Sequence, residues 1–352
     1  MPHLILSTLN ARYAHASLGL RYLFANLDDE LRAETKIVEF VIGSKTETLV
    51  EQLLAFSPKV IGFGVYIWNV EETTKLIAML KAVAAEIKVV IGGPVQRFRW
   101  IEPGEFVMGS PEGEVGRLDR EGPQHVVRVT EGFWLAETAC SQGVWESVMG
   151  SNPSRFKDDP QNPVEQVSWD DVQGFLREVE KRMPGVKAAL PTEAEWEYAC
   201  RAGSKTAFNW GDGIDPSRAN YDGTYSYADG PTGEYREKTV PVKSFEPNAW
   251  GLYQMHGNVD EWCSDGMRKY DGASQVDPRG PTGDEPDAPR ALRGGSWNSR
   301  PARLRAAFRN DWPRGERLDL QGFRFSLRST SSAERSPEAT VAPEGPDRKS
   351  VV

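Results

Sequence analysis

The residues between 298 and 321 are of the kinds that form binding surfaces. Tryptophan and arginine bring large contact areas and several hydrogen-bond donors, and both are enriched where proteins bind their partners. Loops that carry such residues on a rigid scaffold also describe the binding surfaces of antibodies. We therefore predict a ligand-binding face made by the following side chains: Asn298, Ser299, Arg300, Arg303, Phe308, Asn310, Asp311, Trp312, Arg314, Glu316, Asp319 and Gln321.

Cysteines, which hold soft metals and act as nucleophiles, are few and widely spaced. The three are Cys140, Cys200 and Cys263, and no close pair indicates a zinc site or a disulfide framework. Three buried thiols in a reducing compartment are the simplest interpretation. The start of the chain has neither a basic region nor a long apolar region, so no signal peptide is expected. Together these features predict a cytoplasmic protein.

Short helices and long loops must position the predicted binding residues. Ser168 is expected to cap one helix, and Thr192 and Glu195 have the spacing of a capping box at the start of another. The stretch 203–248 is rich in Gly, Asp, Tyr and Pro, and long loops of this kind in an ordered domain usually carry a ligand or an ion. Apolar periodicity predicts the following elements: helices over 140–149, 169–182 and 192–202, and strands over 101–109, 125–130 and 133–136.

Several ordered motifs make residues 101–327 similar to the sulfatase-modifying-factor family, whose best-known member is the formylglycine-generating enzyme. Both the order and the spacing of the motifs match. The resemblance implies an α+β fold of the C-type-lectin-like, formylglycine-generating-enzyme-like kind over residues 95–328. The motifs are Glu105–Ser110, Asn162–Val164, Leu190–Ala199, Gly251–Cys263, Arg293–Trp297 and Gly322–Phe325.

The resemblance also implies where catalysis would occur. The formylglycine-generating enzyme uses two cysteines that follow an Arg-Gly-Gly-Ser motif, and thiolates are ligands suited to monovalent copper. Here Ser299 and Leu304 take those two positions, although Ser296 matches the family's active-site serine. A hydroxyl and an isobutyl group cannot hold copper. We therefore expect no bound copper, no formylglycine formation and no catalytic residue.

An enzymatic alternative stays open. It is a copper- or iron-dependent oxidase or oxygenase of the same family that acts on a protein or small-molecule thiol, with a redox-capable ligand set from elsewhere in the chain. The iron-dependent relatives need three histidines, two of them on one helix. The four histidines of this chain, His3, His15, His125 and His256, are far apart, which disfavours iron.

The resemblance further implies two calcium sites, because a hard cation binds carbonyl and carboxylate oxygens. One departure is Gln254, where the family has Asn or Asp. Alternatively, these polar groups satisfy the backbone of the loops and bind no metal, so calcium is kept as a candidate cofactor. The implied ligands are Gln254, Gly257, Val259 and Glu261 at the first site, and Asn220, Tyr221 and Glu234 at the second.

The framework around 298–321 also resembles the variable region of proteins diversified by diversity-generating retroelements, which display changeable residues on this lectin-like fold. This resemblance implies a non-catalytic ligand-binding or display protein whose ligand is an unknown protein or small molecule. The alternative for Arg300, Arg305, Arg309 and Arg324 is pairing with the many acidic residues of the domain. We expect such pairing for Arg324 and at least one other. A scaffold role is a third hypothesis.

Residues 1–94 alternate strand-like and helical patterns, which predicts a parallel sheet with right-handed crossovers. Three segments, Leu9–Tyr13, Gly62–Tyr66 and Gly92–Pro94, resemble the Rossmann-like cobalamin-binding-type domain of certain radical-SAM enzymes. The Asp-x-His-x-x-Gly motif that ligates cobalt is missing, His15 lies in another context, and the unit stops after its fourth strand, so we expect a truncated domain without cobalamin. Its expected role is docking, an oligomer formed through residues 1–94, or nothing beyond folding. Strands are expected at 4–9, 36–42, 60–66 and 89–92, and helices at 18–31, 48–56 and 70–86.

Length and charge limit the remaining choices. A chain of 352 residues favours two domains, predicted at 1–94 and 95–328. The net charge of −9 disfavours nucleic acid as a partner, and no run of about 18 apolar residues predicts a membrane span. Residues 329–352 are rich in Pro, Glu and Ser, which predicts a disordered tail.

Overall fold

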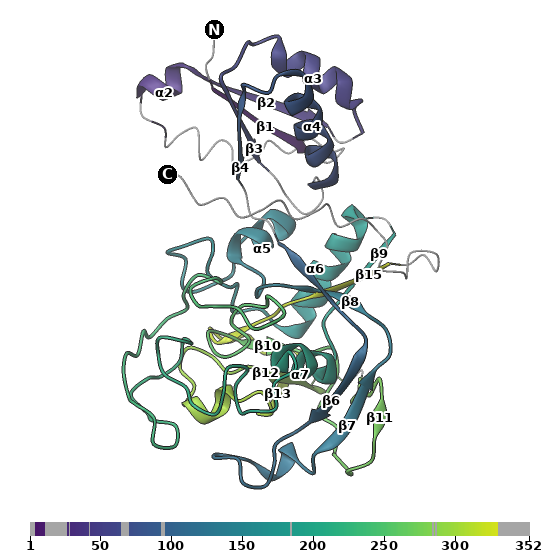
Figure 1. Ribbon diagram of the computed structural model, residues 1–352, viewed down its shortest axis with the longest axis vertical. Coiled ribbons are helices and arrows are strands. Elements are labelled where there is room, and N and C mark those ends of the chain that lie inside the picture. Colours follow the sequence, from purple (N-terminus) through teal and green to yellow (C-terminus); the bar gives the residue numbers. More distant parts are fainter. Residues whose placement is uncertain are drawn as a thin grey trace.

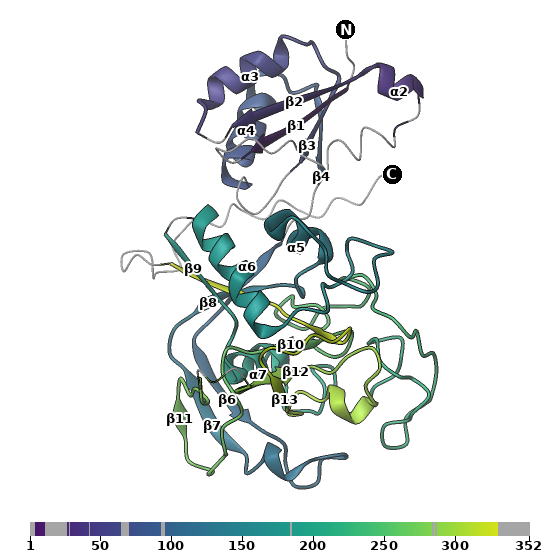
Figure 2. The ribbon, with the colours of Figure 1, turned by 180° about the vertical axis from the view of Figure 1, so that it is seen from behind.

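The computed structural model describes residues 4–10, 27, 29–41, 43–64, 70–92, 96–183, 185–283, 285 and 287–329. Figures 1 and 2 show these residues as two parts that follow one another along the long axis, a small one before residue 93 and a larger one after residue 95. None of the helices within these ranges is both long enough and apolar enough to cross a membrane.

The smaller part is a four-stranded parallel sheet, as predicted. Its strand order is β2-β1-β3-β4, and Ile5 and Ile61 of the central strands share one apolar core with Leu76 and Leu80 of helix α4. Of the predicted helix over 18–31, only residue 27 and residues 29–31 are described. The elements are β1 (Leu4–Asn10), α2 (Asp29–Ala33), β2 (Thr35–Val41), α3 (Thr46–Leu54), β3 (Val60–Gly64), α4 (Val70–Val83) and β4 (Lys88–Gly92).

The larger part combines three small sheets with three α-helices and long loops (Figure 1). The sheets have the orders β13-β12-β10-β14, β11-β7-β6 and β5-β8-β15-β9. The elements are β5 (Phe98–Ile101), β6 (Gly104–Met108), η1 (Asp119–Glu121), β7 (His125–Val129), β8 (Phe133–Ala136), α5 (Gln142–Met149), α6 (Trp169–Arg182), β9 (Val186–Ala189), α7 (Glu193–Arg201), β10 (Asp260–Trp262), β11 (Gln275–Val276), β12 (Pro289–Arg293), η2 (Pro301–Leu304), β13 (Asn310–Pro313), β14 (Gln321–Gly322) and β15 (Ser326–Ser329).

Helices α6 and α7 begin where their caps predict. The Ser168 hydroxyl accepts from the Asp171 N–H, and the Asp171 carboxylate accepts from the Ser168 N–H, which closes a capping box. Thr192 and Glu195 form the same arrangement at α7. The apolar side chains of helix α6, such as Phe175, are buried in one cluster with Trp262 of β10 and with Phe323.

Two predicted boundaries are wrong. The strand expected over 101–109 is β6, which begins only at Gly104, and Ile101 instead ends β5, which belongs to a different sheet. Pro103 separates them, and proline has no N–H to give to a strand ladder. Strand β15 extends to Ser329, one residue into the predicted tail, and residues 330–352 lie outside the described residues.

The sheet β13-β12-β10-β14 positions the predicted binding segment. Strand β12 leads into it, β13 returns antiparallel to β12, and β14 closes it by pairing parallel to β10. Trp262 and Leu292 of this sheet join the largest apolar cluster together with Phe175 of α6. Residues 294–320 therefore leave and re-enter a packed core.

Candidate functional site

The loop after β12 begins with two glycines that both have positive φ, 94° at Gly294 and 74° at Gly295. A Cβ on Gly295 would lie 2.9 Å from Cδ1 of Leu304 and 3.0 Å from the Arg303 carbonyl oxygen. Glycine adopts this conformation without penalty and leaves room for η2. The chain can therefore turn sharply and place η2 close to the end of β12.

At the centre of this turn, the hydroxyl of Ser299 takes the place of the first cysteine thiol of the formylglycine-generating enzyme. The Ser299 Oγ accepts from the Ser296 N–H at 3.1 Å and lies 3.1 Å from the Ser296 Oγ. The Ser296 Oγ also contacts the Asn298 Oδ1 at 3.0 Å. This local network fixes the turn through neutral hydrogen bonds, and a neutral hydroxyl is a poor ligand for monovalent copper.

The second cysteine-equivalent position is apolar. Leu304 is fully buried in a cluster with Phe208, Tyr221 and Tyr227. Its backbone carbonyl accepts a hydrogen bond of 2.6 Å from Nδ1 of His256. The three thiols lie elsewhere in the core, and all are buried. Within the described ranges, no group of three or more His, Cys, Asp or Glu residues is arranged to hold a metal.

Three of the predicted binding side chains form an exposed face on and beside η2. Asn298, Arg300 and Arg303 are exposed. The Arg300 guanidinium lies 4.4 Å from the ring centre of Tyr225, a cation–π contact that orients it. We call Asn298, Arg300, Arg303 and Tyr225 the η2 face.

Other members of the predicted set lie away from the η2 face. Strand β13 places Trp312 opposite Arg290, whereas Asn310 is opposite Leu292, so Trp312 lies toward the far end of β12. Arg314 is bound to Asp170 of α6. The remaining members of the set lie on β13 or in the turn after it. Asn310, Asp311 and Asp319 are partly buried, and Glu316 is exposed.

Ser299, Phe308 and Gln321 are buried, with exposed fractions of 6%, 5% and 0%. Their prediction as surface residues is wrong. Ser299 faces the hydroxyl network, and Phe308 lies under Arg120, whose guanidinium is 5.7 Å from its ring centre. Alternating exposed and buried positions cannot be recognised in an irregular loop, because it has no helical or strand periodicity.

Gln321 nevertheless has an amide group that could bind a ligand. Neither its Oε1 nor its Nε2 has a hydrogen-bond partner among the described residues. Asp260 is its partner in the parallel pairing of β10 and β14, so the two side chains lie on one face of the sheet. A buried amide without partners costs stability, and such exceptions are often functional.

Asp260 is an acidic residue on the same face of the sheet as Gln321. Burial raises the pKa of its carboxyl to about 7, although the nearby Arg303 charge and hydrogen bonds from the Gly295 N–H and Ser296 hydroxyl lower it. The carboxyl therefore changes charge near neutral pH, close enough to Arg303 of the η2 face to feel its charge. Composition and spacing gave no signal for this, because Gly295, Ser296 and Arg303 lie far along the chain from Asp260.

Sequence reasoning also missed the loop that supports Trp297. The Phe156 ring lies 5.5 Å from the Trp297 ring, edge to face. Glu165 holds this loop, since its Oε1 accepts from the Arg155 and Phe156 N–H groups at 2.6 and 2.9 Å. Burial also raises the pKa of the Glu165 carboxyl to about 7. In the sequence, only the position of Glu165 next to a loop with several Pro and Ser residues would have suggested that it holds the loop.

Buried arginines paired with carboxylates form the framework of the domain. The prediction that Arg324 and at least one other arginine pair with acidic residues is confirmed. Arg324 binds Glu261, Arg305 binds Glu114 and Glu121, and Arg309 binds Glu193. Arg293 binds Glu197 in the same way. Arg300 differs, since it is exposed and stacks on Tyr225.

The first implied calcium site does not fit a cation. Both Glu261 oxygens accept from Arg324, at 2.6 and 2.8 Å, and Oε2 also accepts from the Trp196 indole at 2.7 Å. The Gln254 carbonyl oxygen accepts from the Asn258 amide at 2.6 Å. The carboxylate is neutralised and the amide oxygen is engaged, so neither is available to calcium.

The second implied calcium site fits better. The Asn220 Oδ1 is buried and has no partner among the described residues, which is the kind of oxygen that a calcium ion would bind. Tyr221 follows it directly in the chain. Glu234, which is exposed, is paired with Arg236 at 2.9 Å and would have to exchange that partner. Calcium at this site stays a proposal.

The cobalamin prediction concerns residues that are not described. In a parallel sheet, ligands bind beyond the carboxyl ends of the strands. After β1, β3 and β4 these residues are 11–26, 65–69 and 93–95, and His15 is among them. The expected absence of cobalamin therefore rests on the missing cobalt-ligand motif alone.

Comparison with known families confirms both resemblances. The family model "Sulfatase-modifying factor enzyme 1-like domain" matches residues 86–328, and the model "B12 binding domain" matches residues 6–115. The formylglycine-generating enzyme of Streptomyces coelicolor is 34% identical to this chain in an alignment 253 residues long, and the match covers 55% of this chain and 76% of that protein.

Two solved structures support the same fold. PvdO from Pseudomonas aeruginosa matches with a TM-score of 0.57 and 29% identity, over 65% of this chain and 92% of that one. Treponema denticola variable protein 1 matches with a TM-score of 0.55 and 24% identity, over 66% and 94% of the two chains. The predicted fold class is therefore confirmed: a formylglycine-generating-enzyme-like domain preceded by a small Rossmann-like one.

Proposed function

Because the chain belongs to the sulfatase-modifying factor enzyme 1-like family, we propose that it is a non-catalytic member that binds or displays a ligand on the loop between β12 and β14. The observation that carries this proposal is the pair Ser299 and Leu304. The first is bound within a hydroxyl network and the second is enclosed by aromatic rings. Without sulfur at either position, the family's copper chemistry has no ligands.

The η2 face is the part of this loop that we propose contacts the ligand. Its two arginines are exposed, and Arg300 is oriented by Tyr225. Arginine and tyrosine are enriched among residues that dominate binding energy. The rigid support beneath, from Gly295 to the buried Arg305, would reduce the entropy lost on binding.

We further propose that this loop is diversified. The pattern that supports this is the separation of exposed positions, such as Asn298, Arg300 and Arg303, from buried framework positions, such as Leu304 and Ala307. Substitutions at the exposed positions would leave the core unchanged. A reverse transcriptase gene beside a near-copy of the coding repeat for residues 293–328 would support diversification, and a locus with neither would contradict it.

The second candidate is an oxidase that acts on a thiol. It is favoured by one observation: the Cys200 Sγ lies 3.6 Å from Nε2 of His256, whose other nitrogen binds the Leu304 carbonyl. It is the weaker candidate because burial raises the pKa of the Cys200 thiol to about 12. A metal ligand must be the thiolate. The His256 Nε2 also accepts from the Asn209 N–H at 3.1 Å.

Copper(I) binding separates the two candidates. We expect the protein to leave copper(I) with a competing chromophoric chelator, and the double variant Ser299→Cys/Leu304→Cys to take up about one equivalent, because two thiolates suit this ion. The wild-type protein and the double variant differ at those two positions alone, so each serves as the other's control. Stoichiometric copper(I) uptake by the wild-type protein would contradict the proposal.

A further inference from the structure

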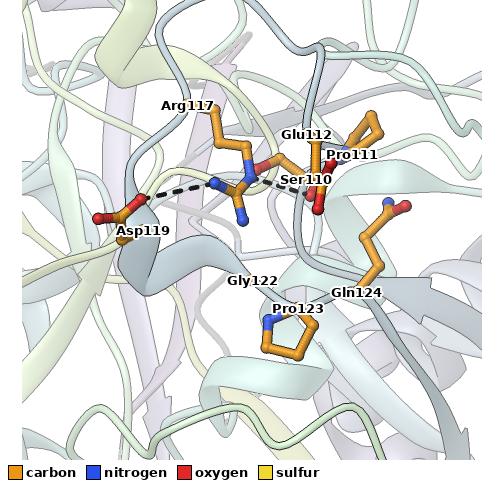
Figure 3. Close-up of a pocket in the computed structure, with 8 residues that line it drawn as sticks. All are labelled: Ser110, Pro111, Glu112, Arg117, Asp119, Gly122, Pro123 and Gln124. Carbon is orange, nitrogen blue, oxygen red and sulfur yellow. Dashed lines mark hydrogen bonds and ion pairs between the residues drawn. The ribbon is translucent and has the colours of Figure 1, made fainter.

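A pocket of about 340 Å³ lies in the loop between β6 and β7, and none of the residues that line it belongs to the η2 face. Its volume is at the lower end of those that bind small molecules. Figure 3 shows the Arg117 side chain between Asp119 and Ser110, with Pro123 and Gln124 on the other side of the opening. The lining residues are Ser110, Pro111, Glu112, Arg117, Asp119, Gly122, Pro123 and Gln124.

The pocket is rigid because buried charges hold both arms of its loop. Arg305 binds Glu114 at 2.6 Å, both oxygens of Glu121 at 2.7 Å, and the Gly116 carbonyl at 2.7 Å. Glu121 also accepts from the Ser110 hydroxyl at 2.8 Å. A second arginine, Arg309, binds the Arg120 carbonyl at 2.8 Å. A preformed pocket of this kind loses little entropy when it binds a ligand.

Arg117 is the one cation that lines the pocket, and its donors are poorly used. Its Nε reaches the Ser110 carbonyl only at 3.4 Å, and its Nη1 lies 3.7 Å from Asp119. By contrast, Arg305 and Arg324 have carboxylate oxygens within 2.8 Å. The side chain of Arg117 is only 20% exposed, whereas that of Asp119 is fully exposed. A guanidinium that is mostly buried without a close partner is suited to a bidentate carboxylate.

The other lining groups add negative charge and hydrogen-bond acceptors. Glu112 and Asp119 place two carboxylates at the rim, so the lining has a net charge of −1. Gln124 donates through Nε2 to the Gly109 carbonyl at 3.1 Å, which leaves its Oε1 as an acceptor. A suitable ligand therefore presents a carboxylate to Arg117 and an N–H group to these acceptors, while Pro111 and Pro123 contact an apolar part.

We propose that this pocket binds a carboxylate that carries an adjacent N–H donor, as in an α-amino acid or the carboxyl-terminal residue of a peptide. The two sources share one chemistry and differ in what precedes the nitrogen. Nothing in the proposal depends on the η2 face or on the loss of copper ligands.

Titration of the full-length protein with small probes, followed by calorimetry or NMR, tests the proposal. We expect saturable binding of N-acetylalanine, and at least about 10-fold weaker binding of N-acetylalaninamide, because a charged hydrogen-bonded pair is lost. Free alanine against tetra-alanine distinguishes the amino-acid source from the peptide source. Absence of N-acetylalanine binding up to about 20 mM, equal binding of N-acetylalaninamide, or tighter binding of inorganic phosphate would overturn the proposal.

Two variants locate the site. Arg117→Gln should weaken N-acetylalanine binding at least about 10-fold, whereas Arg128→Gln, with the same charge change on the exposed face of β7, should leave it unchanged. Gly122→Ala gives an independent variant, since a Cβ there would overlap the Arg117 guanidinium while its φ of −135° suits alanine. Unchanged binding in Arg117→Gln with unchanged tryptophan fluorescence would contradict the assignment.

Discussion

The environment of the Asp260 carboxyl makes the stability of the folded state depend on pH. Burial raises the pKa of Asp260 to about 7, whereas an exposed aspartate titrates near 3.9. Between these two values the folded state holds a proton that the unfolded state has lost. The stability contribution is therefore present at low pH and is lost as the pH rises toward 7.

Asp260→Asn should reduce this pH dependence. Between pH 5 and pH 8, the free energy of unfolding of the variant should rise relative to wild type by about 2–3 kcal/mol, because the amide cannot ionise. Urea unfolding followed by tryptophan fluorescence at both pH values measures it. Glu165, whose pKa is raised to about 7 in the same way, keeps part of the dependence in the variant.

Asp229→Asn is the matched control, because Asp229 is exposed. Its stability difference from wild type should be the same at both pH values. If Asp260→Asn behaves like this control, the folded state does not destabilise the Asp260 carboxylate, and the raised pKa is wrong.

At the scale of elements, buried arginine–carboxylate pairs connect segments that hydrogen-bonded sheets do not. Arg305, at the end of η2, binds Glu114 and Glu121 of the β6–β7 loop, and Arg309, just before β13, binds Glu193 of α7. Each pair is almost completely buried. Removing one partner from such a pair leaves an uncompensated charge in the core.

Arg305→Met should lower the free energy of unfolding by about 3–5 kcal/mol, since it strands two carboxylates. Arg317→Met removes a pair with Asp171 in which the arginine side chain is 56% exposed, and should cost less than about 1 kcal/mol. Urea unfolding of the two variants gives the comparison. Equal effects would show that Arg305 is not a structural anchor.

Gly295→Ala tests the turn that carries η2. The positive φ costs about 1–2 kcal/mol for a residue with a Cβ, and the contacts with Leu304 and Arg303 add to it, so we expect a loss of about 2–4 kcal/mol. Gly315→Ala has no atom within 4 Å of the added Cβ and should be close to neutral. A neutral Gly295→Ala variant would mean that the turn adjusts freely.

Elements set by nearby residues could be predicted, and those set by distant partners could not. The Ser168 and Thr192 caps depend on residues three positions away, and both are present. Glu261 matched an implied calcium ligand, yet its partner Arg324 lies 63 positions along the chain. The burial of Gln321 depends on the pairing of β14 with β10, which no local pattern reveals.

At the scale of the whole molecule, the two parts are built as separate units. Every strand of each sheet comes from one part alone, and each apolar cluster does so too. The larger part therefore contains the proposed binding loop, its supporting sheet and the Arg117 pocket without help from residues 4–92.

A fragment of residues 96–329 should fold alone, because it keeps all three sheets of the larger part. We expect its thermal midpoint, followed by tryptophan fluorescence, to lie within about 4 °C of the full-length value, a shift that corresponds to roughly 1 kcal/mol. Full-length protein at the same concentration is the control. An unfolded fragment would show that residues 4–92 cover a surface that the larger part cannot expose.

The central claim is that this scaffold has lost its oxygen chemistry because Ser299 and Leu304 replace sulfur ligands. Oxygen uptake by purified protein supplied with copper(I) and a cysteine-containing peptide tests this most directly. We predict uptake no greater than that of copper and peptide without protein. Oxygen consumption above that background, in proportion to peptide oxidised, would contradict the account.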